Sequence, residues 1–149
     1  MANPNDAVLE ALSLAVSVRV PVLLWGPPGT GKSSAVASMC ETIGVPYEVV
    51  IASIREPSDF SGLPVVNEEQ VEFAPPRWAK RLSDAGGGLL FLDEISTAPP
   101  AVQAALLRVV LERVVGDLSL PEELSIVAAA NPPDPVSYTH LTLPTNREV

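Results

Sequence analysis

The segment 26–33, GPPGTGKS, places glycines, one lysine and one hydroxyl in the spacing of a phosphate-binding loop. Glycines let backbone N–H groups turn toward phosphate oxygens, and the N-terminus of a following helix adds its dipole. Lys32 can reach the β- and γ-phosphates of a nucleotide, and Ser33 can offer its hydroxyl oxygen to Mg²⁺. The alternative is a turn rich in glycine and proline with a chance lysine, and the apolar strand before and the helical pattern after disfavour it. The predicted nucleotide-binding residues are Gly26, Pro27, Pro28, Gly29, Thr30, Gly31, Lys32, Ser33 and Ser34.

Two adjacent carboxylates, Asp93 and Glu94, follow the apolar run 89–92. The run predicts a buried strand, and α/β sheets bind ligands at the carboxyl ends of their strands. Asp93 at that edge can orient Mg²⁺ through water, and Glu94 can act as a general base on an attacking water. Acidic residues also end strands for purely structural reasons, but the phosphate loop in the same chain favours the catalytic interpretation.

An asparagine, Asn131, follows a further apolar run at 126–130. Its amide can hydrogen-bond a γ-phosphate or an attacking water if the run forms a strand of the same sheet. Asparagine before proline is also a common turn residue. We favour the functional interpretation because the strand that carries the acidic pair immediately precedes this one.

The rest of the chain alternates apolar runs with helical periodicity, which is typical of an α/β fold with a parallel sheet. The pattern also predicts a hairpin at 65–73 and an extended segment at 114–120. Helices are expected at 5–18, 31–43, 77–84 and 99–113, and strands at 20–25, 47–51, 89–92 and 126–130.

Composition argues against a nucleic-acid-binding, a membrane-spanning or a secreted protein. The net charge is −9, and the basic residues form no dense patch, which argues against direct binding of nucleic acid. No uninterrupted apolar run is long enough for a membrane span, and the N-terminus has no secretion signal. Cys40 is the single cysteine, so it forms no internal disulfide, and we expect a buried helix residue in a reducing cytoplasm.

Three segments, GPPGTGKS, LLFLDEISTAPPAVQAALLRVVLE and IVAAANPP, together resemble the AAA+ ATPases, most closely the MoxR-like branch. The resemblance covers nearly all of residues 5–135. It implies that Lys32 and Ser33 belong to Walker A, Asp93 and Glu94 to Walker B, and that Asn131 is sensor 1. The implied cofactors are ATP and Mg²⁺, with Lys32, Glu94 and Asn131 catalytic and with Ser33 and Asp93 at the metal.

The resemblance also implies a fold and partners. The fold is a three-layer P-loop NTPase with a parallel sheet, usually in the strand order 5-1-4-3-2, and the hairpin at 65–73 is similar to an insertion of this branch. Such ATPases form homo-oligomeric rings, commonly hexamers, and remodel a protein client in a chaperone-like way. A von Willebrand factor A domain protein often accompanies them.

The segment 136–149 resembles a translated sequencing adapter, so we expect residues 1–135 to be a partial AAA+ core and 136–149 to be a non-native tail. The fifth strand, the helical lid and the arginine finger are then expected beyond this chain. The strand at 20–25 would lie at an exposed edge, and Arg108 and Arg113 would lie on a helix face. Hydrolysis by this chain alone is expected to be poor.

Three other functions stay open at this point. A P-loop phosphotransferase would use the same loop, although a water-activating glutamate beside Asp93 favours hydrolysis. A GTP-dependent restriction-type motor would act on DNA, which the acidic composition disfavours. A passive nucleotide-gated binding module would not need Lys32, Asp93 and Glu94 together.

Overall fold

The computed structural model describes residues 4–27 and 29–132. Pro28 and the predicted non-native tail at 136–149 lie outside the described residues. The helices are α1 (Pro4–Ser17), α2 (Lys32–Ile43), α3 (Ser58–Ser61), α4 (Arg77–Asp84) and α5 (Pro100–Glu112), with two 3-10 turns, η1 (Ala52–Ile54) and η2 (Ile95–Thr97). The strands are β1 (Val22–Trp25), β2 (Tyr47–Ile51), β3 (Leu63–Asn67), β4 (Gln70–Ala74), β5 (Gly88–Asp93), β6 (Val114–Val115), β7 (Leu118–Ser119) and β8 (Leu124–Ala130).

Four parallel strands form the central sheet, in the order β1-β8-β5-β2. With β5 and β8 counted as the third and fourth strands, this is the order 1-4-3-2 that the family resemblance implies. The registers align the carboxyl ends of the strands, because Trp25 pairs with Ala130 and Ile51 pairs with Asp93. The loops after β1, β5 and β8 therefore leave the sheet at the same edge.

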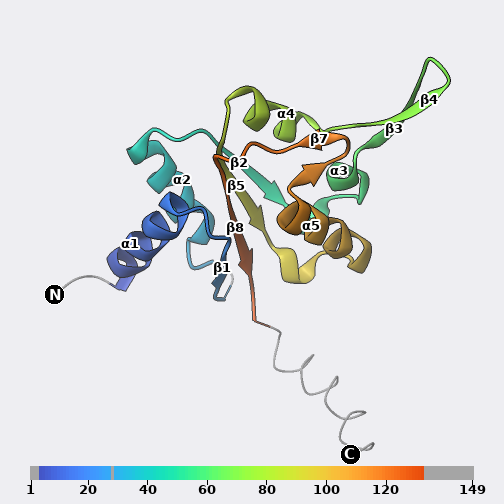
Figure 1. Cartoon of the computed structure of the whole chain (residues 1–149). Helices are drawn as coiled ribbons and strands as arrows, with labels where there is room; N and C mark the ends of the chain where they lie inside the picture. The colour runs from blue at the N-terminus through green and yellow to red at the C-terminus, as the bar shows by residue number, and fades with distance from the viewer. Residues whose placement is uncertain (1–3, 28, 133–149) are drawn as a thin grey trace, which may run out of the picture.

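Helices cover both faces of this sheet, which confirms the three-layer α/β prediction (Figure 1). Successive side chains of a strand point to opposite faces, and β5 supplies both cores in this way. Leu89 and Phe91 pack with residues of α1 and α2, whereas Leu90 and Leu92 pack with residues of α4 and α5. Cys40 is buried in the first of these cores, as expected for a structural cysteine.

The strand β1 is one edge of the described sheet, as predicted. Two of its apolar side chains, Leu23 and Trp25, are 54% and 61% exposed. Together with α5 they border an apolar cavity of about 690 Å³. The strand therefore leaves one hydrogen-bonding side and an adjacent apolar surface open within the described residues.

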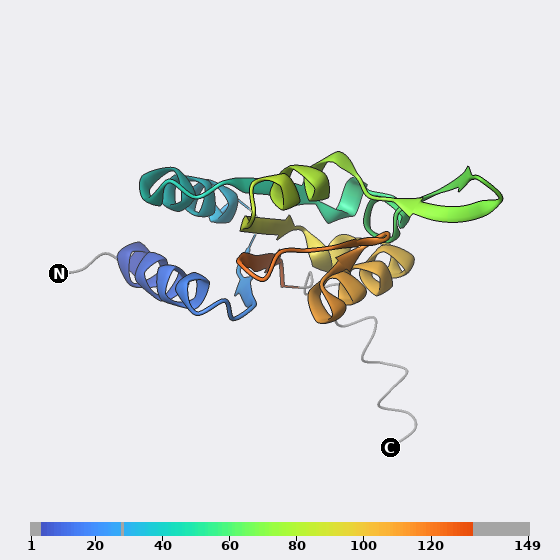
Figure 2. The same ribbon diagram turned by 45° about the horizontal axis from the view of Figure 1, so that its top comes forward.

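The strands β3 and β4 form the predicted antiparallel hairpin, and it extends away from the body of the protein (Figures 1 and 2). Glu68 and Glu69 form its turn with φ values of 45° and 70°, and every residue of both strands is exposed. Asp117 holds the base of the hairpin, because its carboxylate accepts from the Phe73 N–H at 2.7 Å and its own N–H donates to the Phe73 carbonyl at 3.0 Å.

Several local elements differ from the sequence predictions. The segment 114–120 is a small hairpin of β6 and β7 around Gly116 rather than one extended segment. A Cβ on Gly116 would lie 2.5 Å from the Phe73 carbonyl oxygen, so only glycine allows the base of the longer hairpin to approach this turn. The turns η1 and η2 and the short helix α3 were not predicted.

The helices are short. The longest, α1, has 14 residues, and among the described residues no helix is both long and apolar enough to cross a lipid bilayer.

Candidate functional site

The phosphate loop connects β1 to α2, as the sequence predicts. Gly29 and Gly31 adopt φ values of 77° and 78°, a left-handed conformation that side chains disfavour, and this is the reason for glycine at both positions. Thr30 donates its hydroxyl to the Pro27 carbonyl at 3.0 Å and so closes the loop. The N-terminus of α2 begins at Lys32, directly after this turn, and its orphan N–H groups and dipole favour an anion there.

The ammonium group of Lys32 joins the loop to the end of β8. It donates to the Gly26 carbonyl at 2.7 Å, to the Pro27 carbonyl at 3.0 Å and to Asn131 Oδ1 at 3.0 Å. The structure thus brings Lys32 and Asn131, which are 99 residues apart, into direct contact. All three acceptors of the Lys32 ammonium are oxygen atoms. Phosphate oxygens can replace them, because they also accept charge-assisted hydrogen bonds from an ammonium group.

The hydroxyl of Ser33 donates to Asp93 Oδ2 at 2.7 Å. The other carboxylate oxygen, Oδ1, accepts the backbone N–H of Glu94 at 2.9 Å, which fixes the orientation of the carboxylate. One hydroxyl and one carboxylate oxygen thus lie side by side at the edge of the sheet. Hard oxygen donors of this kind suit Mg²⁺, which takes few protein ligands and keeps several waters.

Glu94 has an uncommon backbone conformation, with φ 55° and ψ 41°. A residue other than glycine in this region carries strain, and such residues cluster at functional sites. Its side chain accepts a hydrogen bond from the hydroxyl of Ser53 in η1, which directly follows β2. Sequence reasoning missed Ser53. The signal was available, since Ser53 is the first hydroxyl after the strand that the predicted order places beside the Asp93 strand.

The predicted residues meet in one cavity of about 280 Å³. Gly26 and Pro27 do not line it, although their carbonyls accept from Lys32, and Pro28 lies outside the described residues. The lining residues are Gly29, Thr30, Gly31, Lys32, Ser33, Ser34, Asp93, Glu94 and Asn131. The cavity therefore combines backbone N–H groups, one cation, two carboxylates, hydroxyls and an amide.

The two arginines of the α5 region do not line this cavity; Arg108 lies on a face of α5 as expected, whereas the prediction of a helix-face position is wrong for Arg113, which follows the helix as its C-terminal cap. Arg108 pairs with Glu112 one helical turn away at 3.0 Å. Arg113 ends the helix with φ 56°, and its guanidinium donates to the carbonyls of Pro121, at 3.0 Å, and Leu124. Its role within this chain is to hold the start of β8.

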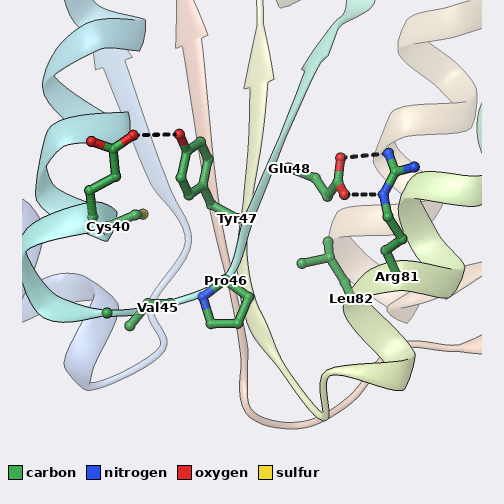
Figure 3. A pocket seen from close by; sticks show the side chains of 9 residues that line it. Cys40, Val45, Pro46, Tyr47, Glu48, Arg81 and Leu82 are labelled. Carbon is green, nitrogen blue, oxygen red and sulfur yellow. Dashed lines mark hydrogen bonds and ion pairs between the residues drawn. The ribbon is translucent and has the colours of Figure 1, made fainter.

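A second cavity, of about 420 Å³, lies at the amino end of β2, away from the phosphate loop (Figure 3). Its polar groups are already partnered with one another. Tyr47 donates to Glu41 at 3.1 Å, and this hydrogen bond raises the tyrosine pKa. Arg81 forms a two-point ion pair with Glu48, which raises the arginine pKa. Since these groups bond to each other, the 280 Å³ cavity at the phosphate loop is the better candidate for chemistry.

Comparison with known proteins agrees with this choice. Residues 21–147 match the family model described as AAA domain (dynein-related subfamily). The Psp operon transcriptional activator of Escherichia coli (strain K12) is 35% identical over 139 residues, which cover 87% of this chain and 42% of that protein. Chaperone MoxR1 of Mycobacterium tuberculosis is 28% identical over 133 residues, which cover 86% of this chain and 34% of that protein. The chain thus spans less than half the length of these curated relatives.

Solved structures share the fold. A protein of Cytophaga hutchinsonii described as an ATPase superposes with a TM-score of 0.61 at 22% identity, covering 88% of this chain and 40% of that one. NtrX of Brucella abortus, solved in complex with ADP, superposes with a TM-score of 0.59 at 17% identity, covering 96% of this chain and 32% of that one. The resemblance to AAA+ ATPases and their MoxR-like branch is confirmed, and the chain belongs to the AAA domain family, dynein-related subfamily.

Proposed function

We propose that this chain is the nucleotide-binding core of a MoxR-like AAA+ ATPase that binds and hydrolyses ATP, and that this chain alone hydrolyses ATP only slowly. The observation that carries the proposal is the 280 Å³ cavity, because Lys32, Ser33, Asp93, Glu94 and Asn131 all line it. These residues come from the first turn of one helix and from the ends of two adjacent strands. A chance cluster would not combine a phosphate loop with a carboxylate pair and an amide at one edge of a sheet.

Each side chain has a role that follows from its position. The loop N–H groups and Lys32 hold the phosphate chain, and Lys32 exchanges its oxygen partners for phosphate oxygens. Glu94 accepts a proton from the attacking water as a general base, and Asn131 orients that water or the γ-phosphate. Ser33 and Asp93 would hold Mg²⁺, which supplies charge neutralisation on the β- and γ-phosphates.

For the whole protein we propose a homo-oligomeric ring, hexameric by analogy, that acts in the cytoplasm on a protein client of the von Willebrand factor A domain class. The relative MoxR1 of Mycobacterium tuberculosis is a chaperone, which supports a protein client. Lys80 and Arg81 pair with Asp84 and Glu48, which leaves little positive charge there for a nucleic acid. From the resemblance of 136–149 to a translated adapter we also propose that residues 1–135 are the ATPase core and 136–149 a non-native tail, although the family match runs to residue 147.

A second candidate is the ATPase module of a transcriptional activator. The observation that favours it is the 35% identity to the Psp operon activator, which exceeds the 28% identity to MoxR1. Sequencing the source locus on both sides of this reading frame separates the two. A neighbouring von Willebrand factor A gene supports the remodelling ATPase, and a DNA-binding domain in the same frame supports the activator.

The reaction itself is tested by incubating the full chain with Mg·ATP in water enriched in ¹⁸O. Hydrolysis releases phosphate that carries one ¹⁸O atom, since the oxygen that attacks the γ-phosphate comes from solvent water. Transfer of the phosphoryl group to another acceptor, without labelled phosphate, would assign a phosphotransferase instead. A matched Lys80→Ala variant, altered on the exposed face of α4, should behave as the wild type.

A further inference from the structure

Asn131 is the first residue beyond the last paired position of β8, where Trp25 pairs with Ala130. The ladder ends there with the Gly26 N–H donating to the Ala130 carbonyl at 3.2 Å. The next residue, Pro132, has no N–H group and cannot extend the ladder. The backbone of Asn131 must therefore be held by something other than the sheet if its amide is to keep one position.

Ser96 supplies those contacts. Its hydroxyl accepts the Asn131 N–H at 3.1 Å and donates to the Asn131 carbonyl at 3.2 Å. A single hydroxyl thus satisfies both backbone groups of the residue whose side chain meets Lys32 at 3.0 Å. No other residue type except threonine carries a short aliphatic hydroxyl that could do the same.

The turn that carries Ser96 is itself fixed at two points. Gln103, in the first turns of α5, donates to the Ile95 carbonyl at 3.0 Å and to the Ser96 carbonyl at 3.4 Å. Thr97 donates to the Glu94 carbonyl at 3.3 Å. Because Glu94 directly precedes this turn, the same short segment determines where the general base and Asn131 lie relative to each other.

We propose that Ser96 is a positioning residue that fixes Asn131 against Lys32 and the nucleotide, and so couples Asn131 to the turn that carries Glu94. The inference rests on the proposed ATPase function for its kinetic consequence. The structural part of the inference, that the Ser96 hydroxyl holds the Asn131 backbone through two hydrogen bonds, does not depend on any activity.

The kinetic test compares Ser96→Ala, Ser96→Thr and Ser17→Ala in the full chain. Ser17 also donates its hydroxyl to a backbone carbonyl, that of Leu14, but it lies on α1 away from the site, so it is the matched control. Ser96→Ala should lower kcat about three- to tenfold, the size expected for the loss of one or two hydrogen bonds, with an unchanged Kd for ATP. Ser96→Thr should restore most of the rate, and Ser17→Ala should match the wild type.

A double-variant cycle tests the route through Asn131. If Ser96 acts by holding Asn131, then Ser96→Ala combined with Asn131→Ala should lose no more activity than Asn131→Ala alone. Full additivity of the two losses would overturn the proposal, as would a Ser96→Ala variant with the wild-type kcat.

A measurement without nucleotide separates this inference from the proposed function. Amide hydrogen exchange followed by NMR should show faster exchange of the Asn131 N–H in Ser96→Ala than in the wild type or in Ser17→Ala. If the wild-type chain hydrolyses no ATP, the proposed function fails and this exchange rate decides the positioning role. An unchanged exchange rate at Asn131 would overturn it.

Discussion

The hydroxyl of Ser53 donates a hydrogen bond to the carboxylate of Glu94 across 41 residues of sequence. The two residues follow adjacent parallel strands, β2 and β5, at the point where Ile51 pairs with Asp93. Glu94 is thus held from two sides, by the strained backbone at φ 55° and by this side-chain contact. The contact determines the direction in which the candidate general base points.

Replacing Ser53 by alanine should lower the rate of ATP hydrolysis about three- to tenfold, because the Glu94 carboxylate loses its fixed direction. Binding of ATP should be unchanged, since Ser53 is not among the residues that line the nucleotide cavity. Steady-state kinetics with a separate binding titration would measure both quantities. Ser61→Ala is the control, because that hydroxyl bonds only the Pro57 carbonyl of its own turn. Equal rates for Ser53→Ala and the wild type would show that Glu94 does not depend on this contact.

Replacing Lys32 by alanine should abolish detectable binding of ATP. The side chain is the only cation among the residues that line the cavity of the described structure, and it carries the contacts that link the loop to Asn131. Isothermal titration calorimetry with Mg·ATP measures the loss. Lys80→Ala removes the same side chain from the exposed face of α4 and should bind as the wild type does. Retention of wild-type affinity in Lys32→Ala would contradict the proposal that this loop binds the phosphates of ATP.

Replacing Phe91 by alanine should destabilise the fold by about 3–5 kcal/mol, because the ring is fully buried in the centre of β5 and its loss leaves a cavity. Urea unfolding followed by circular dichroism measures the change. Leu111→Ala, at a position that is 76% exposed on α5, should cost less than about 0.5 kcal/mol. A small effect at Phe91 would mean that the core can collapse around the missing ring.

Burial raises the pKa of the Cys40 thiol above its ordinary value of 9.0, and the neighbouring Glu41 adds to the effect. The folded state therefore binds this proton more tightly than the unfolded state. Any stability from this group is present below pH 9.0 and is lost as the pH rises through the higher folded pKa. At pH 8 the thiol should react with iodoacetamide only after denaturation, as measured by mass spectrometry. Rapid labelling of the native protein would show that Cys40 is accessible.

The sequence predicted the elements that local residue types determine. The strand at 47–51 and the helix at 77–84 were predicted with the observed bounds, and the helix predicted to end at residue 43 does end there, before Gly44 in the left-handed conformation. The short helix α3 was missed because tertiary contacts, rather than the local sequence pattern, stabilise its four residues. Phe60, for example, is buried against Trp78.

The residues of the candidate site also fall into two groups, those that the sequence predicted and those that it did not. Lys32, Ser33, Asp93, Glu94 and Asn131 were found because motif spacing and the ends of strands reveal them. Ser96 was missed because an isolated serine carries no local signal, and Ser53 was missed although its place after the strand at 47–51 indicated the same edge of the sheet. Their importance depends on contacts to residues 41 and 35 positions away, which only the folded chain brings together.

The most direct measurement is single-turnover hydrolysis of Mg·ATP by the wild type and by Glu94→Gln, with binding of ATP measured in both. The substitution keeps the size of the side chain and one acceptor oxygen but removes the base. Glu94→Gln should therefore bind ATP as the wild type does and hydrolyse it at least about 100-fold more slowly. Hydrolysis at the wild-type rate by Glu94→Gln would contradict the assignment of Glu94 as the general base and, with it, the proposed mechanism.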